Sequence, residues 1–341
     1  MARKRKTLPD NFYSEARAGN IEEVKKILSQ CDKSAQYRAI QNSNTPPEVI
    51  EWLVKECGID INDTMAFEEA AQDRPEILGL LLSLGADMKQ KQDITLCYIA
   101  RYHRPKGLRE MIKYGADVHT YVAVIHSQEV DTLTWALAMC STHYIIDTAE
   151  MAEILLNESV EVTPLMKEYV TKIGTDYEFR RNSLDPQYYN IDAMDAALEK
   201  MYQLFDVPPV PHRKLYDGSE PITVQSKTWQ KRYKELLDML VPGNGSSAFV
   251  QGEVIRITGK LRYEVLHEGC AHWDSEFRKM RDALAEYLSS GKPAKEEIIT
   301  KVKQVARSTQ PEVFDDIIKA SVRWVLQNPD PIPLGKVDYE R

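Results

Sequence analysis

The chain has 341 residues, of which 43% are hydrophobic and 28% are charged, and its formal net charge is −8. These values are ordinary for a globular protein and leave enough chain for two or three hydrophobic cores. The sequence contains no apolar run of about 18 residues or more, which excludes a membrane-spanning helix.

The N-terminal tail, residues 1–7, is basic, but no apolar segment follows it, so it does not read as a secretory signal. We interpret it as a solvated terminus, with a contact to nucleic acid or a targeting signal as the alternatives. The acidity lies before Trp229: residues 1–228 carry 26 Lys and Arg against 35 Asp and Glu, and the rest carries 18 against 17. This distribution argues against nucleic acid as the main partner.

The cysteines bear on the compartment. There are five, an odd number, and no two of them stand at C-x-x-C spacing. Most lie in apolar helical settings, where a free thiol behaves as a small hydrophobic side chain. A reducing, cytoplasmic compartment therefore fits the sequence best.

A short phrase recurs three times in the first half of the chain. Each copy follows an apolar helical segment and contains a glycine and an aspartate two positions later, and the glycines are 27 and 30 residues apart. Glycine adopts the left-handed conformation that ends a helix, and aspartate bonds nearby amides in a turn. The period is typical of stacked helical hairpins. The copies are Gly58-Ile59-Asp60-Ile61-Asn62, Gly85-Ala86-Asp87-Met88-Lys89 and Gly115-Ala116-Asp117-Val118-His119.

These phrases resemble the end of the ankyrin repeat, and the likeness covers residues 8–163. In a fourth unit, Thr95-Leu96-Cys97-Tyr98-Ile99-Ala100 stands where the family has Thr-Pro-Leu-His-x-Ala, so Cys97 replaces the usual histidine. A fifth unit is expected over residues 135–163, with Ser159 in place of glycine and an insertion near residues 140–148. A generic α-helical solenoid is the alternative. The first unit matches the family pattern through Ala16, Gly19, Asn20, Ile21, Glu22, Val24, Ile27 and Leu28.

The resemblance implies a protein-binding scaffold or adaptor whose repeat array recognises a protein partner. Stacked hairpins present an extended face and a row of turn tips rather than a pocket that concentrates reactive groups. We therefore assign no catalytic residue, no cofactor and no metal to this half. The predicted binding residues are the turn tips Asn62, Asp63, Lys89, Gln90, His119 and Thr120.

Two segments connect the array to the second half. Residues 164–206 are predicted to form capping helices, because the apolar positions from Ile191 to Phe205 share one helical face. Three prolines within Val207–Pro211 then stop the helix. Residues 207–228 are predicted to be a stiff linker, with a proline-rich ligand motif as the alternative.

The second domain, residues 229–327, is predicted to be a bundle of five helices. Apolar residues recur there at intervals of three and four, and the stripes begin at Trp229, Val250, Trp273, Ile298 and Val313. Residues 328–341 are expected to be a loose tail. The predicted fold class is thus all-α: a degenerate ankyrin-like solenoid of helical hairpins followed by a C-terminal helical bundle.

One cluster in the bundle contains residue types that bind metals or perform catalysis. His267-Glu268-Gly269-Cys270-Ala271-His272 offers imidazole and thiol groups, but the spacing is not that of a helical zinc site, and Gly269 indicates a helix-ending turn. No sequence motif supports Cys270 as a nucleophile beside either histidine. We predict a structural turn without a metal.

The stretch from Gly252 to Gly259 is the other unusual feature of the bundle. Glycine within a helix is less favourable than alanine by about 1 kcal/mol, so we predict that both glycines permit close helix packing, with a bound ligand as the alternative. Glu253 and Arg256 are predicted to be a solvated ion pair, with a buried charge pair or a functional site as the alternatives. The alternative function is an enzyme whose site lies in residues 229–327, and a polar pocket joining Glu253, Arg256 and His267 would favour it.

Overall fold

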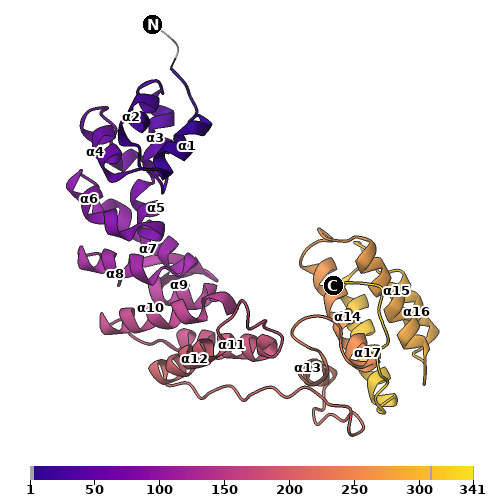
Figure 1. The fold of residues 1–341 in the computed structure, drawn as a ribbon. Helices are drawn as coiled ribbons and strands as arrows, with labels where there is room; N and C mark the ends of the chain where they lie inside the picture. Colours follow the sequence, from indigo (N-terminus) through magenta and orange to yellow (C-terminus); the bar gives the residue numbers. More distant parts are fainter. Residues whose placement is uncertain (1–3, 308, 341) are drawn as a thin grey trace. The chain divides into compact units, whose positions relative to one another are not determined.

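The structure, a computed structural model, describes residues 4–307 and 309–340 (Figure 1). It is mostly helical, and the sheet found in the described residues has only two strands, which confirms the all-α class. The chain divides into two compact units. Unit 1 comprises the chain up to Gly174 together with Asn190–Pro209, and unit 2 comprises Thr175–Tyr189 together with the chain from Val210 onward.

Unit 1 is built from short consecutive helices whose apolar faces pack on one another. Helices α3, α5, α7 and α9 each contact the next of this set, while α2 contacts α4, and α8, α10 and α12 contact in sequence. The described helices are α1 (Asp10–Arg17), α2 (Ile21–Ser29), α3 (Lys33–Gln41), α4 (Pro47–Lys55), α5 (Ala66–Asp73), α6 (Leu78–Ser83), α7 (Met88–Tyr102), α8 (Pro105–Lys113), α9 (Thr132–Met139), α10 (Ile145–Asn157), α11 (Pro164–Arg181) and α12 (Ile191–Phe205), with single turns η1 (Ile61–Asp63), η2 (Pro75–Ile77) and η3 (Thr142–Tyr144). The part of α11 from Thr175 onward belongs to unit 2.

The helix-ending turns of unit 1 repeat one backbone geometry. Gly58, Gly85 and Gly115 have φ of 67°, 99° and 87°, and Ser159 has 67°. After three of them, the next amide donates to a helix carbonyl five residues back: Ala86 to Leu81, Ala116 to Met111 and Val160 to Leu155. The predicted helix-ending role of the glycines is confirmed, and Ser159 takes the same conformation without being glycine.

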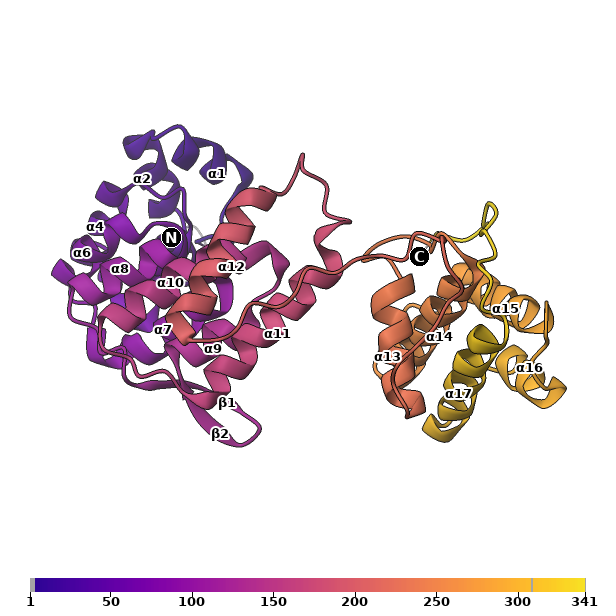
Figure 2. The same cartoon turned by 90° about the horizontal axis from the view of Figure 1, so that it is seen from below.

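A β-hairpin interrupts the helices, which the sequence analysis did not predict. Strands β1 (Tyr121–Ile125) and β2 (Gln128–Asp131) pair antiparallel, and the two loop residues, His126 and Ser127, both have positive φ. Figure 2 shows the hairpin projecting from the helices of unit 1. The expected insertion near residues 140–148 is therefore wrong. The extra chain lies earlier, because the β-branched and aromatic run of β1 favours a strand.

The described part of unit 2 contains the five helices predicted for it. They are α13 (Trp229–Leu240), α14 (Val250–Leu266), α15 (Ser275–Ser289), α16 (Glu296–Lys303) and α17 (Pro311–Gln327). Helix α14 is central, since it contacts α13, α15 and α17, and every residue from 250 to 258 is buried. Polar side chains in this stretch must find partners within the protein.

The predicted linker is largely wrong, because residues 210–228 belong to unit 2. Arg213 donates to the carbonyls of Phe179 (2.8 Å) and Leu237 (3.0 Å) and also to that of Val241. Ile222 is part of the hydrophobic core of unit 2. A cation that satisfies carbonyls at the end of a helix is favourable, and so is burial of an apolar side chain. Together these contacts hold an extended segment in place.

The tail expected to be loose is also packed. The amide of Val250, at the start of α14, donates to the carbonyl of Ile332 over 2.8 Å, and Gln251 bonds the carbonyls of Asn328 and Asp330. The side chain of Tyr339 is buried in the core of unit 2. The first amides of a helix have no acceptor within the helix, and the tail supplies an acceptor for one of these amides, that of Val250.

Candidate functional site

The tips of unit 1 are held by three equivalent aspartate turns. Asp60 accepts from the amide of Asn62 (2.9 Å), Asp87 from that of Lys89 (3.0 Å), and Asp117 from that of His119 (2.9 Å). The recurring phrase therefore places a residue at the same point of each turn. Such turns fix the backbone through the aspartate side chain, so the side chain at the tip is not needed to hold the turn.

The six predicted binding residues fall into two groups. Asp63, Lys89, Gln90 and His119 are exposed, whereas Asn62 and Thr120 are half-buried. Thr120 donates to the carbonyl of Asp117 in its own turn. Four of the six side chains are thus available to a partner.

Asn62 joins two successive turns. Its Nδ2 donates to the carbonyl of Gly85 (2.9 Å), and its Oδ1 accepts from the amide of Asp87 (2.8 Å). Gln92 makes one bond of this kind in the next unit, where its Oε1 accepts from the amide of Asp117 over 3.1 Å. These amide side chains space the turns, so the role of Asn62 is structural.

An exposed apolar surface on α7 was missed by the sequence analysis. We call Ile94, Tyr98 and Tyr102 the α7 edge. They are spaced four residues apart, and the rings of Tyr98 and Tyr102 stack with centroids 6.3 Å apart. Ile94 and Tyr102 are exposed, as are Tyr121 and Val124 of the hairpin, whose strand β1 contacts α7 and α9. The i, i+4 spacing was the available signal, but a helical stripe usually indicates a buried face.

His103, at the end of α7, is a buried polar group of unit 1. It is 1% exposed, and its Nδ1 lies 2.9 Å from the hydroxyl of Thr148. Its Nε2 lies 3.3 Å from the carbonyl of Met139, which can only accept, so Nε2 carries the proton. Burial lowers the pKa of His103 to about 4. The neutral ring therefore links α7 to α9 and α10.

In unit 2, Glu253 and Arg256 form a buried ion pair, so the expected solvated pair is wrong. They are 0% and 4% exposed, because they lie in the part of α14 that α13, α15 and α17 bury. Glu253 Oε2 accepts from Arg256 Nε over 2.8 Å, and Oε1 accepts from Nη2 over 2.6 Å. This paired, two-point geometry fixes the guanidinium.

Two further groups bond the carboxylate of Glu253. The amide of Ser247 donates to Oε2 and the hydroxyl of Tyr339 donates to Oε1, each over 2.9 Å. Burial raises the pKa of Tyr339, so it remains a donor. A fully bonded network of this kind compensates the desolvation of the two charges.

The glycines of α14 permit close packing, as predicted. A Cβ on Gly252 would lie 2.1 Å from Ser247 Oγ and 2.7 Å from the carbonyl oxygen of Leu240. A Cβ on Gly259 would lie 2.5 Å from the hydroxyl of Tyr233, which donates to the carbonyl of Ile255.

Beside Gly259 lies a depression that we call the aromatic groove. Its volume is about 440 Å³. Arg256 lines it, but Glu253 and His267 do not, so this groove does not join the three residues. The lining residues are Phe179, Tyr233, Leu237, Val241, Pro242, Gly243, Asn244, Gly245, Arg256, Gly259, Lys260, Tyr263, Glu264 and Phe277.

The turn from His267 to His272 ends α14, as predicted. Gly269 and Cys270 both have positive φ, and burial raises the pKa of the Cys270 thiol, which disfavours the reactive thiolate. His272 lies against Glu264, with Nδ1 3.4 Å from Oε2. Within the described residues, no group of three or more His, Cys, Asp or Glu side chains is arranged to hold a metal ion.

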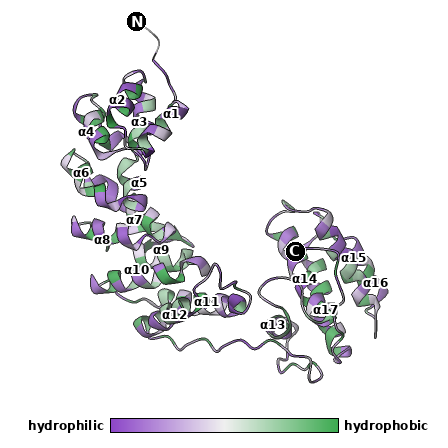
Figure 3. Cartoon of the chain, in the orientation of Figure 1, coloured by the Kyte–Doolittle hydropathy of each residue, from purple (hydrophilic) through white to green (hydrophobic). Residues whose placement is uncertain are grey.

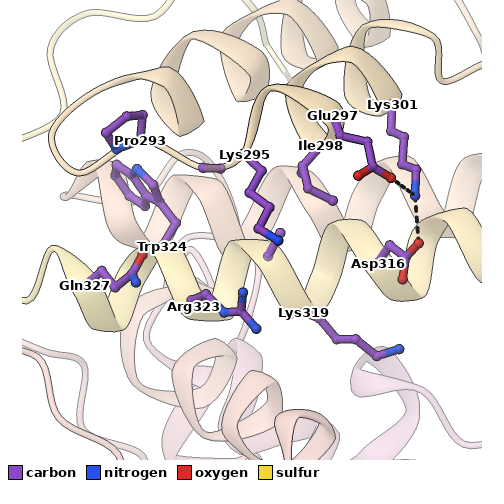
Figure 4. A pocket seen from close by; sticks show the side chains of 12 residues that line it. Pro293, Lys295, Glu297, Ile298, Lys301, Asp316, Lys319, Arg323, Trp324 and Gln327 are labelled. Atoms are coloured by element: carbon purple, nitrogen blue, oxygen red, sulfur yellow. Dashed lines mark hydrogen bonds and ion pairs between the residues drawn. The ribbon is translucent and has the colours of Figure 1, made fainter.

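A second depression, the cationic groove, lies between α16 and α17 and has a volume of about 410 Å³ (Figure 4). Lys301 bonds Asp316 (2.8 Å) and Glu297 (3.1 Å). Lys295 and Arg323 reach toward the same space from the two sides. Neither forms an ion pair with any carboxylate in the described part of the chain. This groove could not be predicted from the sequence, because its charged residues are usual on exposed helix faces.

Comparison of the chain with protein-family models, curated proteins and solved structures returns no match. Among the described helices, none combines the length and the apolar character needed to cross a membrane. Figure 3 shows apolar and polar residues alternating along the helices of both units.

Proposed function

We propose that unit 1 is a degenerate ankyrin-like array of helical hairpins and that the protein is a scaffold or adaptor that binds a protein partner through it. Three features support the array: the consecutive contacts of α3, α5, α7 and α9, the repeated left-handed turns, and the aspartate bond in each turn. Repeats of this kind contact mainly their neighbours and present a continuous surface.

The observation that carries the proposal is the exposed α7 edge. Ile94 and Tyr102 remain in contact with water although burial would be favourable. Tyrosine is enriched at protein interfaces, because it offers a large rigid apolar surface and a hydroxyl. The exposed tips Lys89 and Gln90 begin the same helix, so apolar and polar groups are available on one element.

The partner suited to this surface is a protein segment with apolar side chains for Ile94 and Tyr102 and polar groups for the tips. Tip residues alone offer mostly solvated side chains, which contribute little at the rim of an interface. We therefore place the main contact on the α7 edge and the specificity on Lys89, Gln90 and His119.

The alternative function, an enzyme in residues 229–327, draws no support from the Glu253–Arg256 pair. The carboxylate of Glu253 is bonded by Arg256, Ser247 and Tyr339, and its side chain is fully buried. A general acid or base must instead reach the substrate.

Site-specific photocrosslinking tests the proposal. A benzophenone amino acid replaces Tyr102 on α7 in one variant and Tyr114, just after α8, in the other. The two tyrosines are matched, with exposed fractions of 38% and 37%. We expect one defined protein to be crosslinked at position 102 and not at position 114. Equal labelling at both positions, or labelling at 114 alone, would contradict the assignment of the surface.

A further inference from the structure

The cationic groove between α16 and α17 contains more positive charge than its carboxylates compensate. Lys301 bonds both of these carboxylates, over 3.1 Å and 2.8 Å, so neither of them is left for another cation. Two positive charges are in excess in the lining, although the whole chain has a net charge of −8. The charged residues of the lining are the cations Lys295, Lys301, Lys319 and Arg323 and the carboxylates Glu297 and Asp316.

Lys295 and Arg323 are the two cations that a ligand can reach. Lys295 is the N-cap residue of α16, Arg323 lies on α17, and both are exposed. Figure 4 shows their side chains extending into the groove from its two sides. Within the described residues, neither side chain has an ion pair or a hydrogen bond. Lys319 differs from them, because its ammonium group lies over the ring of Trp229, 5.3 Å from the centroid.

The spacing of the cations on α17 concentrates their charge. Lys319 and Arg323 stand four residues apart, which places both on one face of the helix. Like charges at this spacing destabilise a helix. A concave surface lined by charges of one sign also strengthens the electric field that an ion experiences there. A bound anion would relieve this repulsion.

The rest of the lining contains an apolar surface. Ala294, Ile298 and Ala320 are half-buried, and Trp324 is buried. The indole of Trp324 is fixed, since its Nε1 donates to the carbonyl of Ser290 over 3.1 Å. The groove volume of about 410 Å³ lies within the range of about 300–1,000 Å³ that is usual for ligand pockets. A short organic group therefore fits beside the two cations.

We propose that the cationic groove binds a small phosphate monoester. A phosphate monoester at neutral pH carries a charge of about −1.5 to −2 on one compact group with three acceptor oxygens, which suits two cations that extend toward the same space. Arg323 offers planar paired donors for phosphate oxygens, and Lys295 adds a point charge. The organic body of the ligand contacts Ile298 and Ala320. This site is separate from the protein-binding surface proposed for unit 1.

Two phenyl esters that differ in charge test the proposal on the full chain by isothermal titration calorimetry. Phenyl phosphate is a dianion at pH 8, and phenyl sulfate is a monoanion of similar shape. In about 50 mM salt, where exposed charges are only partly screened, we expect phenyl phosphate to bind at one site per chain with a Kd below about 1 mM. Phenyl sulfate should bind at least about fivefold more weakly, because it cannot neutralise both cations. Absence of phenyl phosphate binding, or equal affinity for the two esters, would overturn the proposal.

A double variant, Lys295→Gln with Arg323→Gln, locates the site. The matched control, Lys303→Gln with Arg278→Gln, removes the same two charges from exposed positions of α16 and α15 that do not line the groove. All four changes are at the surface, so both double variants should show the wild-type thermal melt. We expect the groove variant to weaken phenyl phosphate by at least about tenfold and the control by no more than about twofold. An equal loss in both variants, or undiminished binding in the groove variant, would contradict the proposal.

Discussion

The hydroxyl of Tyr339 donates a hydrogen bond to the buried carboxylate of Glu253 over 2.9 Å, joining positions 86 residues apart. This bond attaches the tail to the central helix of unit 2. It also completes the set of donors around a carboxylate that is paired with Arg256. The tail is therefore a part of the core that satisfies a buried charge.

Tyr339→Phe should lower the stability of unit 2. The change removes one donor from Glu253 and keeps the ring, so we expect a loss of about 1–2 kcal/mol in the free energy of unfolding. Urea unfolding followed by tryptophan fluorescence measures it. Tyr188→Phe, at an exposed tyrosine, is the control and should change nothing. A wild-type unfolding curve for Tyr339→Phe would show that the tail does not support the pair.

His103 should make unit 1 sensitive to acid. Burial lowers its folded pKa from 6.5 to about 4, so the unfolded chain binds the proton more readily. The stability that the neutral ring of His103 contributes to unit 1 is fully present above pH 6.5. This contribution, at most about 3 kcal/mol, is lost as the pH falls toward 4. Unfolding free energies measured between pH 7 and pH 4 test this. The slope should be smaller in His103→Gln and unchanged in His126→Gln, whose histidine is exposed.

Gly259→Ala should destabilise unit 2, although alanine favours a helix over glycine by about 1 kcal/mol. The new Cβ would lie 2.5 Å from the hydroxyl of Tyr233. We expect a net loss of about 1–3 kcal/mol from overpacking. Adding Tyr233→Phe removes the clashing atom and should restore most of the thermal stability. If the single variant is more stable than the wild type, the close approach is not a constraint.

The turn residues of unit 1 should divide into those that bind the partner and those that stabilise the fold. Lys89→Glu, Gln90→Ala and His119→Ala combined should weaken partner capture while each change shifts stability by less than about 0.5 kcal/mol. Asn62→Ala should do the opposite, lowering stability by about 1–2 kcal/mol, because it removes both bonds between two turns. Pull-downs and circular dichroism melts of the two variants distinguish the roles. An unchanged melt for Asn62→Ala would remove the structural assignment.

Local patterns in the sequence predicted much of the helical framework. The apolar stripes located α13 to α17, and the recurring glycines located the turns that end α4, α6 and α8. Both signals arise within a few residues, since a stripe reports one face of a helix and a glycine reports one backbone conformation.

Long-range contacts could not be predicted in the same way. Ile222 and Tyr339 each lie in an extended segment without periodicity, and their burial depends on helices far away in the chain. The pair Glu253 and Arg256 has the spacing of a surface pair, and only the packing around α14 makes it buried. The exposure of the α7 edge was not predicted for the converse reason: its i, i+4 stripe resembles a buried helix face.

The affinity of the partner crosslinked at position 102 tests the central claim most directly. It is measured for the wild type, for Ile94→Glu combined with Tyr102→Glu, and for the control Tyr114→Glu, each in the full chain with a wild-type melt. The account predicts that the α7 variant binds at least about tenfold more weakly, which corresponds to about 1.4 kcal/mol, and that the control binds as the wild type does. Undiminished affinity in the α7 variant would contradict the assignment of protein binding to the α7 edge.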